Sequence, residues 1–138
     1  MHRISRNRYV AGALALSLAA MAHAAGFDGN SRLMCEAEHG HDCLPTGSQC
    51  SPLKPETKIA PVFEIDFANR TIHSPYRRSL LHVSQMSTNT ESFVLQGADL
   101  LFAWSALINR TTGALTVSIA DREGAYIVFG KCKAAKRE

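Results

Sequence analysis

The clearest alternation of apolar and polar positions in the chain lies between Leu100 and Cys132. Every second residue is apolar in two runs, first at Phe102, Trp104, Ala106 and Ile108 and then at Leu115, Val117 and Ile119. A period of two is typical of half-buried strands. Glycine-containing turn signals at 109–113 and 121–124 separate these runs from a third apolar run at 125–129. The pattern therefore predicts an antiparallel meander of three strands.

Further strands are predicted upstream, from residue 59 onward. The alternating residues Phe63, Ile65 and Phe67 point to one side of an amphipathic strand, and Val62, Glu64 and Asp66 to the other. A turn at 68–70 leads into a short return strand at 71–73. Another strand is predicted over 91–96, which brings the total to about six. Short strands at such spacings indicate a mainly β domain, either a small barrel or a sandwich.

Residues 75–86 fit neither the helical nor the strand period well. Ser74-Pro75 is a start signal for a helix, because serine caps helices and proline suits the first helical position. The neighbouring segments are all β, and we therefore predict a strand over 80–86, with the helix as the alternative.

Ahead of this β domain at 59–138, the segment 25–58 shows no sustained period. It is rich in polar residues and turn formers, including Pro45, Gly47, Pro52 and Pro55. A long irregular segment is uncommon in a compact domain unless something ties it down. We expect an irregular N-terminal arm whose cysteines attach it to the sheet.

Residues 1–24 have the pattern of a secretory signal peptide. Basic residues at the start precede an apolar run at 10–20, and Ala22-His23-Ala24 matches a cleavage site after Ala24. The apolar run is too short for a stable membrane anchor. The sequence therefore predicts a periplasmic or secreted protein without a membrane span after cleavage.

Cleavage also changes the charge of the protein. The full chain carries 15 basic and 12 acidic residues, a net charge of +3. Removing Arg3, Arg6 and Arg8 leaves 12 basic residues against 12 acidic ones. A mature chain near neutrality has no electrostatic reason to bind nucleic acid. Its 114 residues suffice for one domain with a single core.

Four cysteines survive processing, namely Cys35, Cys43, Cys50 and Cys132. An even number in an exported chain indicates two disulfides, with three possible connectivities. We favour Cys35–Cys132, which would close most of the domain, together with Cys43–Cys50. The long loop is worth about 4–5 kcal/mol in the chain-entropy model and the short loop about 2.5 kcal/mol.

The segment from Cys35 to Cys43 also contains the candidate metal ligands His39 and His41. Thiolates and imidazoles at close spacing suit zinc or copper. However, the spacing matches no standard zinc pattern, and disulfides would leave only the two histidines. We therefore predict no metal and no other cofactor, with a weak histidine site as the alternative.

No catalytic motif is present: the sequence lacks G-x-S-x-G, C-x-x-C, H-E-x-x-H and a glycine-rich phosphate loop. Glu64 and Asp66 form a carboxylate pair of the kind used in glycoside hydrolysis, but alternating acids on an exposed strand face are common. Trp104 is expected in the core. Asn69-Arg70-Thr71 and Asn109-Arg110-Thr111 match the glycosylation pattern, and we interpret both as turns.

The segment I-N-R-T-T-G-A-L and the ending F-G-K-C resemble those of small exported bacterial proteins of unassigned function. This resemblance implies export and a β fold with a terminal cysteine, and it assigns no site residues. We expect a non-enzymatic protein that binds a protein or another component of the cell envelope. The alternatives are metal binding through His39 and His41 and, third, hydrolysis of an envelope polymer.

Overall fold

The computed structural model describes residues 27–47, 49–53, 61–74 and 79–135. These residues form no helix, so none of them belongs to a helix that could cross a membrane. They form ten strands: β1 (Leu33–Cys43), β2 (Ser51–Pro52), β3 (Val62–Asp66), β4 (Thr71–Ser74), β5 (Ser79–His82), β6 (Gln85–Thr88), β7 (Ser92–Ala98), β8 (Phe102–Asn109), β9 (Ala114–Asp121) and β10 (Ala125–Ala134).

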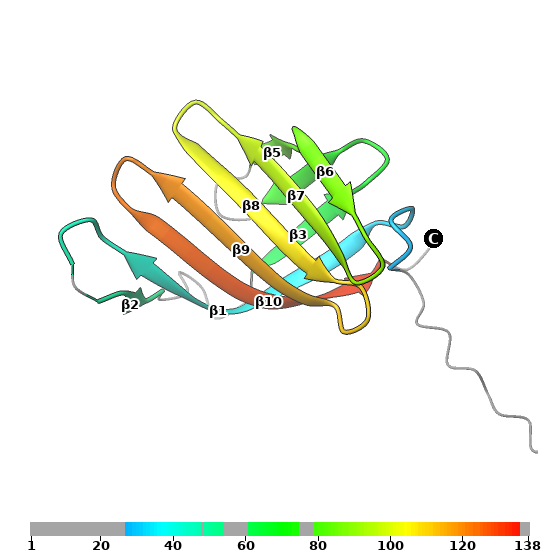
Figure 1. The fold of residues 1–138 in the computed structure, drawn as a ribbon, viewed down its shortest axis with the longest axis horizontal. Coiled ribbons are helices and arrows are strands. Elements are labelled where there is room, and N and C mark those ends of the chain that lie inside the picture. Colours follow the sequence, from blue (N-terminus) through cyan, green and yellow to red (C-terminus); the bar gives the residue numbers. More distant parts are fainter. Residues whose placement is uncertain (1–26, 48, 54–60, 75–78, 136–138) are drawn as a thin grey trace, which may run out of the picture.

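All ten strands belong to one antiparallel sheet that curls into a half-barrel (Figure 1). Nine of them follow the order β5-β4-β3-β1-β10-β9-β8-β7-β6, and β2 pairs with β1 outside this path. The meander predicted for the last third of the chain is confirmed as β8, β9 and β10. The antiparallel, mainly β class is also confirmed, although the sheet has ten strands rather than about six.

The prediction of an irregular arm at 25–58 is wrong for residues 33–43, which form a strand. β1 is an 11-residue strand that pairs with β10 along its whole length and with β3 over its first half. A bulge between Ala37 and His39 shifts the register, so the buried positions 33, 35 and 37 are followed by Gly40 rather than by residue 39. This shift interrupts the period of two, and the strand cannot be recognised from the pattern alone. Residues 54–58 lie outside the described part of the chain.

The single strand expected over 80–86 is also wrong. Within this segment the chain passes from one edge of the sheet to the other, so that two short strands form instead of one. β5 and β6 lie at opposite ends of the strand order but are separated by only Val83 and Ser84. The backbone N–H of Val83 donates to the Arg70 carbonyl, and that of Ser84 donates to the Gln96 carbonyl. These two residues therefore bridge the two edges, and the buried Val83 side chain fills the core between them.

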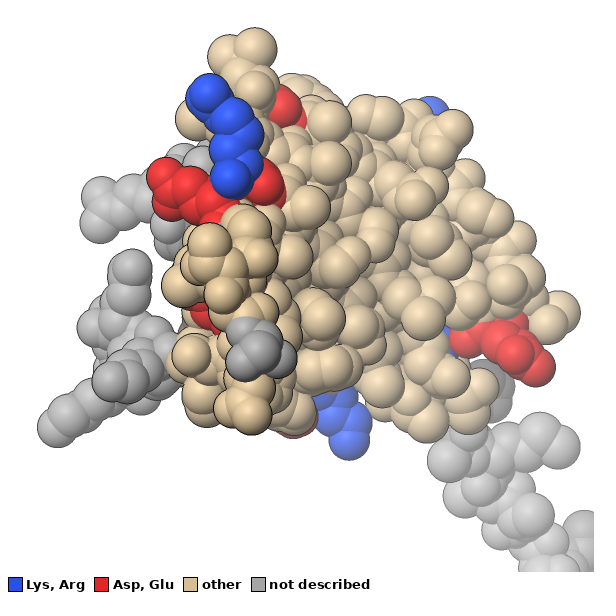
Figure 2. Space-filling view, turned by 60° about the vertical axis from the view of Figure 1, so that its left-hand side comes forward, with Lys and Arg blue, Asp and Glu red and all other residues tan. Residues whose placement is uncertain are grey.

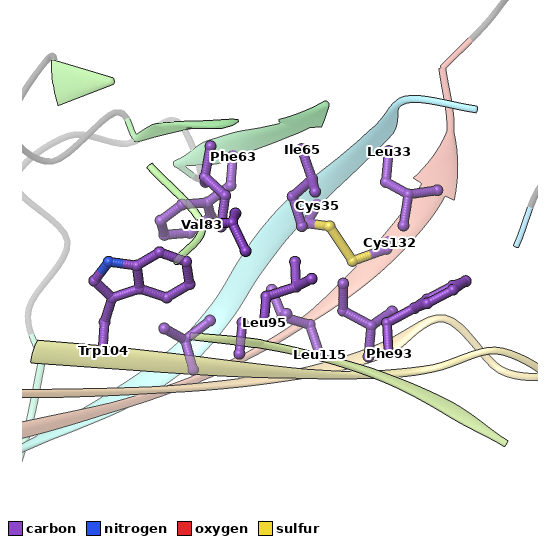
Figure 3. Close-up of a cluster of buried hydrophobic side chains, with 14 of the residues drawn as sticks. Leu33, Cys35, Phe63, Ile65, Val83, Phe93, Leu95, Trp104, Leu115 and Cys132 are labelled. Atoms are coloured by element: carbon purple, nitrogen blue, oxygen red, sulfur yellow. A yellow bond between two sulfur atoms is a disulfide. The ribbon is translucent and has the colours of Figure 1, made fainter. Parts of the chain in front are cut away.

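The core lies inside the curled sheet and draws side chains from both halves (Figure 3). Alternate residues of each predicted strand point inward, and Trp104 is buried as expected. The largest fully buried side chains are Phe93, Leu33, Leu95, Ile108 and Cys35. Burial of this apolar surface is the main force that holds a single sheet in a curled shape.

Two disulfides join Cys35 to Cys132 and Cys43 to Cys50. These are the two pairs favoured from the sequence. The first bridge links directly opposite residues of β1 and β10, 97 positions apart in the chain, and lies in the core (Figure 3). The second closes the loop between β1 and β2.

Both Asn-Arg-Thr segments are turns, as predicted. In the second, the side chain of Asn109 accepts hydrogen bonds from the backbone N–H groups of Thr111 and Thr112. Asn89 makes the same arrangement with Glu91 and Ser92. Asparagine favours such turns because its short side chain replaces a backbone acceptor.

Candidate functional site: an uncharged face of the sheet

Much of the outer surface of β7, β8 and β9, with β10 as far as Phe129, forms a face without charged side chains. Alternate residues of these strands point away from the core and make up what we call the uncharged face: Val94, Gln96, Ala98, Ala103, Ser105, Leu107, Thr116, Ser118, Ala120, Ala125, Ile127 and Phe129. Figure 2 shows a broad uncharged area over these strands, with acidic and basic side chains at its margins.

The register arranges the uncharged face in three rows across the four strands. The first row joins Val94, Leu107, Thr116 and Phe129, and the second joins Gln96, Ser105, Ser118 and Ile127. The third row consists only of alanines, Ala98, Ala103, Ala120 and Ala125. Because alanine side chains are short, this row allows a close approach by another surface.

The polar groups of the uncharged face are partly satisfied within it. The hydroxyl groups of Ser105 and Ser118 lie 2.9 Å apart and hydrogen-bond to each other across β8 and β9. Leu107 lies two positions after Ser105 on β8 and remains 47% exposed. Solvent-facing surfaces normally carry about 25–35% charged residues, whereas charged residues are depleted in the cores of protein interfaces.

His39 and His41 extend two of these rows onto β1. His39 lies opposite Phe129, and the two rings stack with their centroids 5.1 Å apart. His41 lies opposite Ile127 in the next row. Within the described residues, no group of three or more His, Cys, Asp or Glu side chains could hold a metal ion. The structure therefore places both histidines at the border of the uncharged face.

Two exposed leucines form the tip of the turn between β7 and β8, at one end of the uncharged face. Leu100 is 97% exposed and Leu101 56% exposed. The turn is closed by the backbone N–H of Asp99, which donates to the Phe102 carbonyl, while the Asp99 side chain accepts from the N–H of Leu100. Turn tips normally carry Gly, Asn, Asp or Ser, so this pair is unusual.

The sequence pattern alone did not reveal this apolar tip. Apolar residues at 100 and 101 are equally compatible with the start of a strand, and the strand begins only at Phe102. The available signal was the absence of any turn-forming residue after Asp99. Gly97 and Ala98, which follow the strand predicted over 91–96, belong to β7.

The carboxylate pair Glu64 and Asp66 has a structural role. Arg32 contacts both, with its Nη1 3.0 Å from Glu64 Oε1 and its Nε 2.9 Å from Asp66 Oδ2. Asp66 is buried rather than exposed as expected. Hydrogen bonds from the backbone and side chain of Asn69, together with the charge of Arg32, lower the pKa of Asp66. A general acid needs a raised pKa, so Asp66 lacks that feature of a glycosidase site.

Comparisons with protein-family models, with curated proteins and with solved structures found no match to this chain. The resemblance of its ending to small exported bacterial proteins therefore remains a prediction. No site residues can be transferred from a relative, and the functional argument depends on the geometry described above.

Proposed function

We propose that this chain is an exported, non-catalytic protein of the periplasm or the extracellular space, and that it binds a partner protein through the uncharged face. The observation that carries this proposal is the absence of Lys, Arg, Asp and Glu from twelve neighbouring outward positions on four strands. Most of these twelve side chains are apolar, and large contiguous apolar patches on a protein surface often mark sites of interaction.

The chemistry of the uncharged face favours protein over other macromolecules. Nucleic acids and anionic lipid surfaces are held by clusters of Lys and Arg, and this face has none. The exposed Leu107 and the half-buried Phe129, both in the first row, are apolar side chains of the kind that interface cores contain. The row of alanines suits a second sheet, which packs about 10 Å away when side chains are small.

Export is supported by two features of the chain. Residues 1–24, which lie outside the described part, have the composition of a signal peptide. The four cysteines form two disulfides, which persist in oxidising compartments and are rare in the cytosol.

Capture of partners from envelope extract tests the proposal. Leu107→Lys places a charge in the first row of the uncharged face, and Leu80→Lys is the matched control, because Leu80 is similarly exposed but lies on β5. We expect one partner to be retained by the wild type and by Leu80→Lys and lost by Leu107→Lys. Equal recovery by all three proteins, or no recovery above background, would contradict the proposal.

The alternative of metal binding depends on His39 and His41 alone. Both side chains lie on the outer side of β1, two positions apart, and no third ligand accompanies them among the described residues. Metal analysis of untagged protein purified without chelator, beside the variant His39→Ala/His41→Ala, decides this alternative. Metal in the wild type and not in the variant would support it.

A further inference from the structure

A separate hollow of about 480 Å³ lies on the outer side of β1, β3 and β10, next to the uncharged face. Its lining includes two acidic, two basic and two apolar side chains, namely Glu36, Glu38, Lys131, Lys133, Met34 and Val62. Its volume lies within the range of small-molecule sites.

The register explains why these side chains meet. Glu36 of β1 lies opposite Lys131 of β10 on one side and Val62 of β3 on the other. Met34, two positions earlier, lies opposite Lys133. The hollow therefore has an acidic row contributed by β1 and a basic row contributed by β10.

Glu38, two positions after Glu36, adds the second acid. Glu38 is the extra residue between Ala37 and His39, and it has no partner in the register with β10. It is exposed on the same side of β1 as Glu36, as expected for residues two positions apart in a strand. A Cβ at Gly130 would meet the Glu36 carbonyl oxygen and Ala37 Cα, so the close approach of the strands here requires glycine.

The four charged groups of the hollow make no ion pair or hydrogen bond with any described residue. The ion pairs in the described part of the chain join Arg32 to Glu64 and Asp66 instead. Opposite charges that face each other across strands normally attract. Here Glu36 and Lys131 lie opposite each other without a contact within 4.0 Å, so both signs of charge remain available to a ligand.

We propose that this hollow binds a short zwitterionic peptide. The ligand's ammonium group lies against Glu36 and Glu38, and its carboxylate lies against Lys131 and Lys133. Charge-assisted hydrogen bonds from lysine to carboxylate and from ammonium to glutamate are the strong kind. Met34 and the partly exposed Val62 supply the apolar contact for the peptide's side chains. The hollow does not overlap the uncharged face, and this inference is independent of the proposed partner binding.

Titration of the ¹⁵N-labelled mature protein with trialanine, followed by NMR, tests the inference. We expect saturable shifts of the backbone amides at 34–38 and 130–133, and weaker binding at high salt because the contacts are charged. Trialanine with an acetylated amino terminus and trialanine with an amidated carboxyl terminus should each bind at least about tenfold more weakly.

Two variants locate the site, Glu36→Gln/Glu38→Gln and Lys131→Gln/Lys133→Gln. Each should weaken trialanine binding by about tenfold or more, whereas the exposed Glu123→Gln on the β9–β10 turn should bind like the wild type. The capped peptides test the wild type alone, so the result does not depend on the folding of a variant. No saturable shift up to about 10 mM, or equal affinity for free and capped peptides, would overturn the inference.

Discussion

Cys35 and Cys132 lie directly opposite each other on β1 and β10, and their disulfide joins the first long strand of the sheet to the last. β1 and β10 lie in the middle of the strand order. The disulfide therefore cross-links β1 to β10 near the middle of the sheet, and it closes a loop that contains almost the whole domain.

The first prediction concerns the unequal contributions of the two disulfides to the free energy of unfolding. In the chain-entropy model, Cys35→Ala/Cys132→Ala lowers the free energy of unfolding by about 4–5 kcal/mol, and Cys43→Ala/Cys50→Ala lowers it by about 2.5 kcal/mol. Urea unfolding followed by circular dichroism measures both. The reverse order of the two losses would contradict this explanation.

The second prediction concerns Gly97 of β7, which lies close to the end of β5 at His82. A Cβ at Gly97 would lie 2.6 Å from both the His82 carbonyl oxygen and Trp104, so Gly97→Ala must displace one of them. We expect a loss of about 1–3 kcal/mol in the free energy of unfolding. Gly47→Ala is the control, because its nearest contact is 3.2 Å and its expected change is within about 0.5 kcal/mol. Similar losses in both variants would argue against a tight closure at Gly97.

The third prediction concerns Arg110, which holds the chain at the other end of the sheet. Its Nε donates to the Phe27 carbonyl at 3.0 Å, its Nη1 donates to the Asn89 carbonyl at 2.6 Å, and its guanidinium lies over the ring of Phe93. Lysine cannot reproduce the forked geometry, so Arg110→Lys should cost about 1–3 kcal/mol in thermal or urea unfolding. Arg122→Lys is the control: Arg122 lies in an exposed turn, so this substitution should change the free energy of unfolding little. If Arg110→Lys unfolded with the same free energy as the wild type, the forked contacts of Arg110 would not contribute to stability.

The fourth prediction concerns the pH dependence of the Asp66 contacts. The pKa of Asp66 is lowered in the folded state, so its ionised form stabilises the fold above the ordinary value of 3.8, and this contribution is lost as the pH falls through the folded pKa. Asp66→Asn should therefore be less stable than the wild type at pH 7, by about 1–2 kcal/mol. The difference should shrink as the pH falls below 3.8. Urea midpoints across pH would contradict this explanation if the difference stayed constant.

Much of the sheet could be predicted because its later strands keep a strict period of two. The inward side of β8, from Phe102 to Ile108, follows the pattern directly, and so does β9. β1 was not predicted as a strand, because a bulge at Glu38 and a glycine at position 40 interrupt its alternation of apolar and polar residues. The change of edge at Val83 depends on contacts with Arg70 and Gln96, which are distant in sequence and leave no local signal.

The candidate site was less accessible to prediction than the fold. The outward residues of a single strand, such as Ala103, Ser105 and Leu107, look ordinary by themselves. Their lack of charge becomes notable only when the register aligns four such strands. His39 and His41 are recognisable in the sequence as candidate metal ligands, but only the pairing with β10 shows that Phe129 and Ile127 are their neighbours.

Both the stability of the sheet and the proposed role outside the cytoplasm depend on export followed by oxidation of four cysteines. The most direct test is the mass of the intact protein recovered from its own compartment, alkylated before and after reduction. We expect a chain that begins at Ala25 and whose four cysteines are alkylated only after reduction. Alkylation of all four without reduction, or a chain that retains residues 1–24, would contradict the proposal.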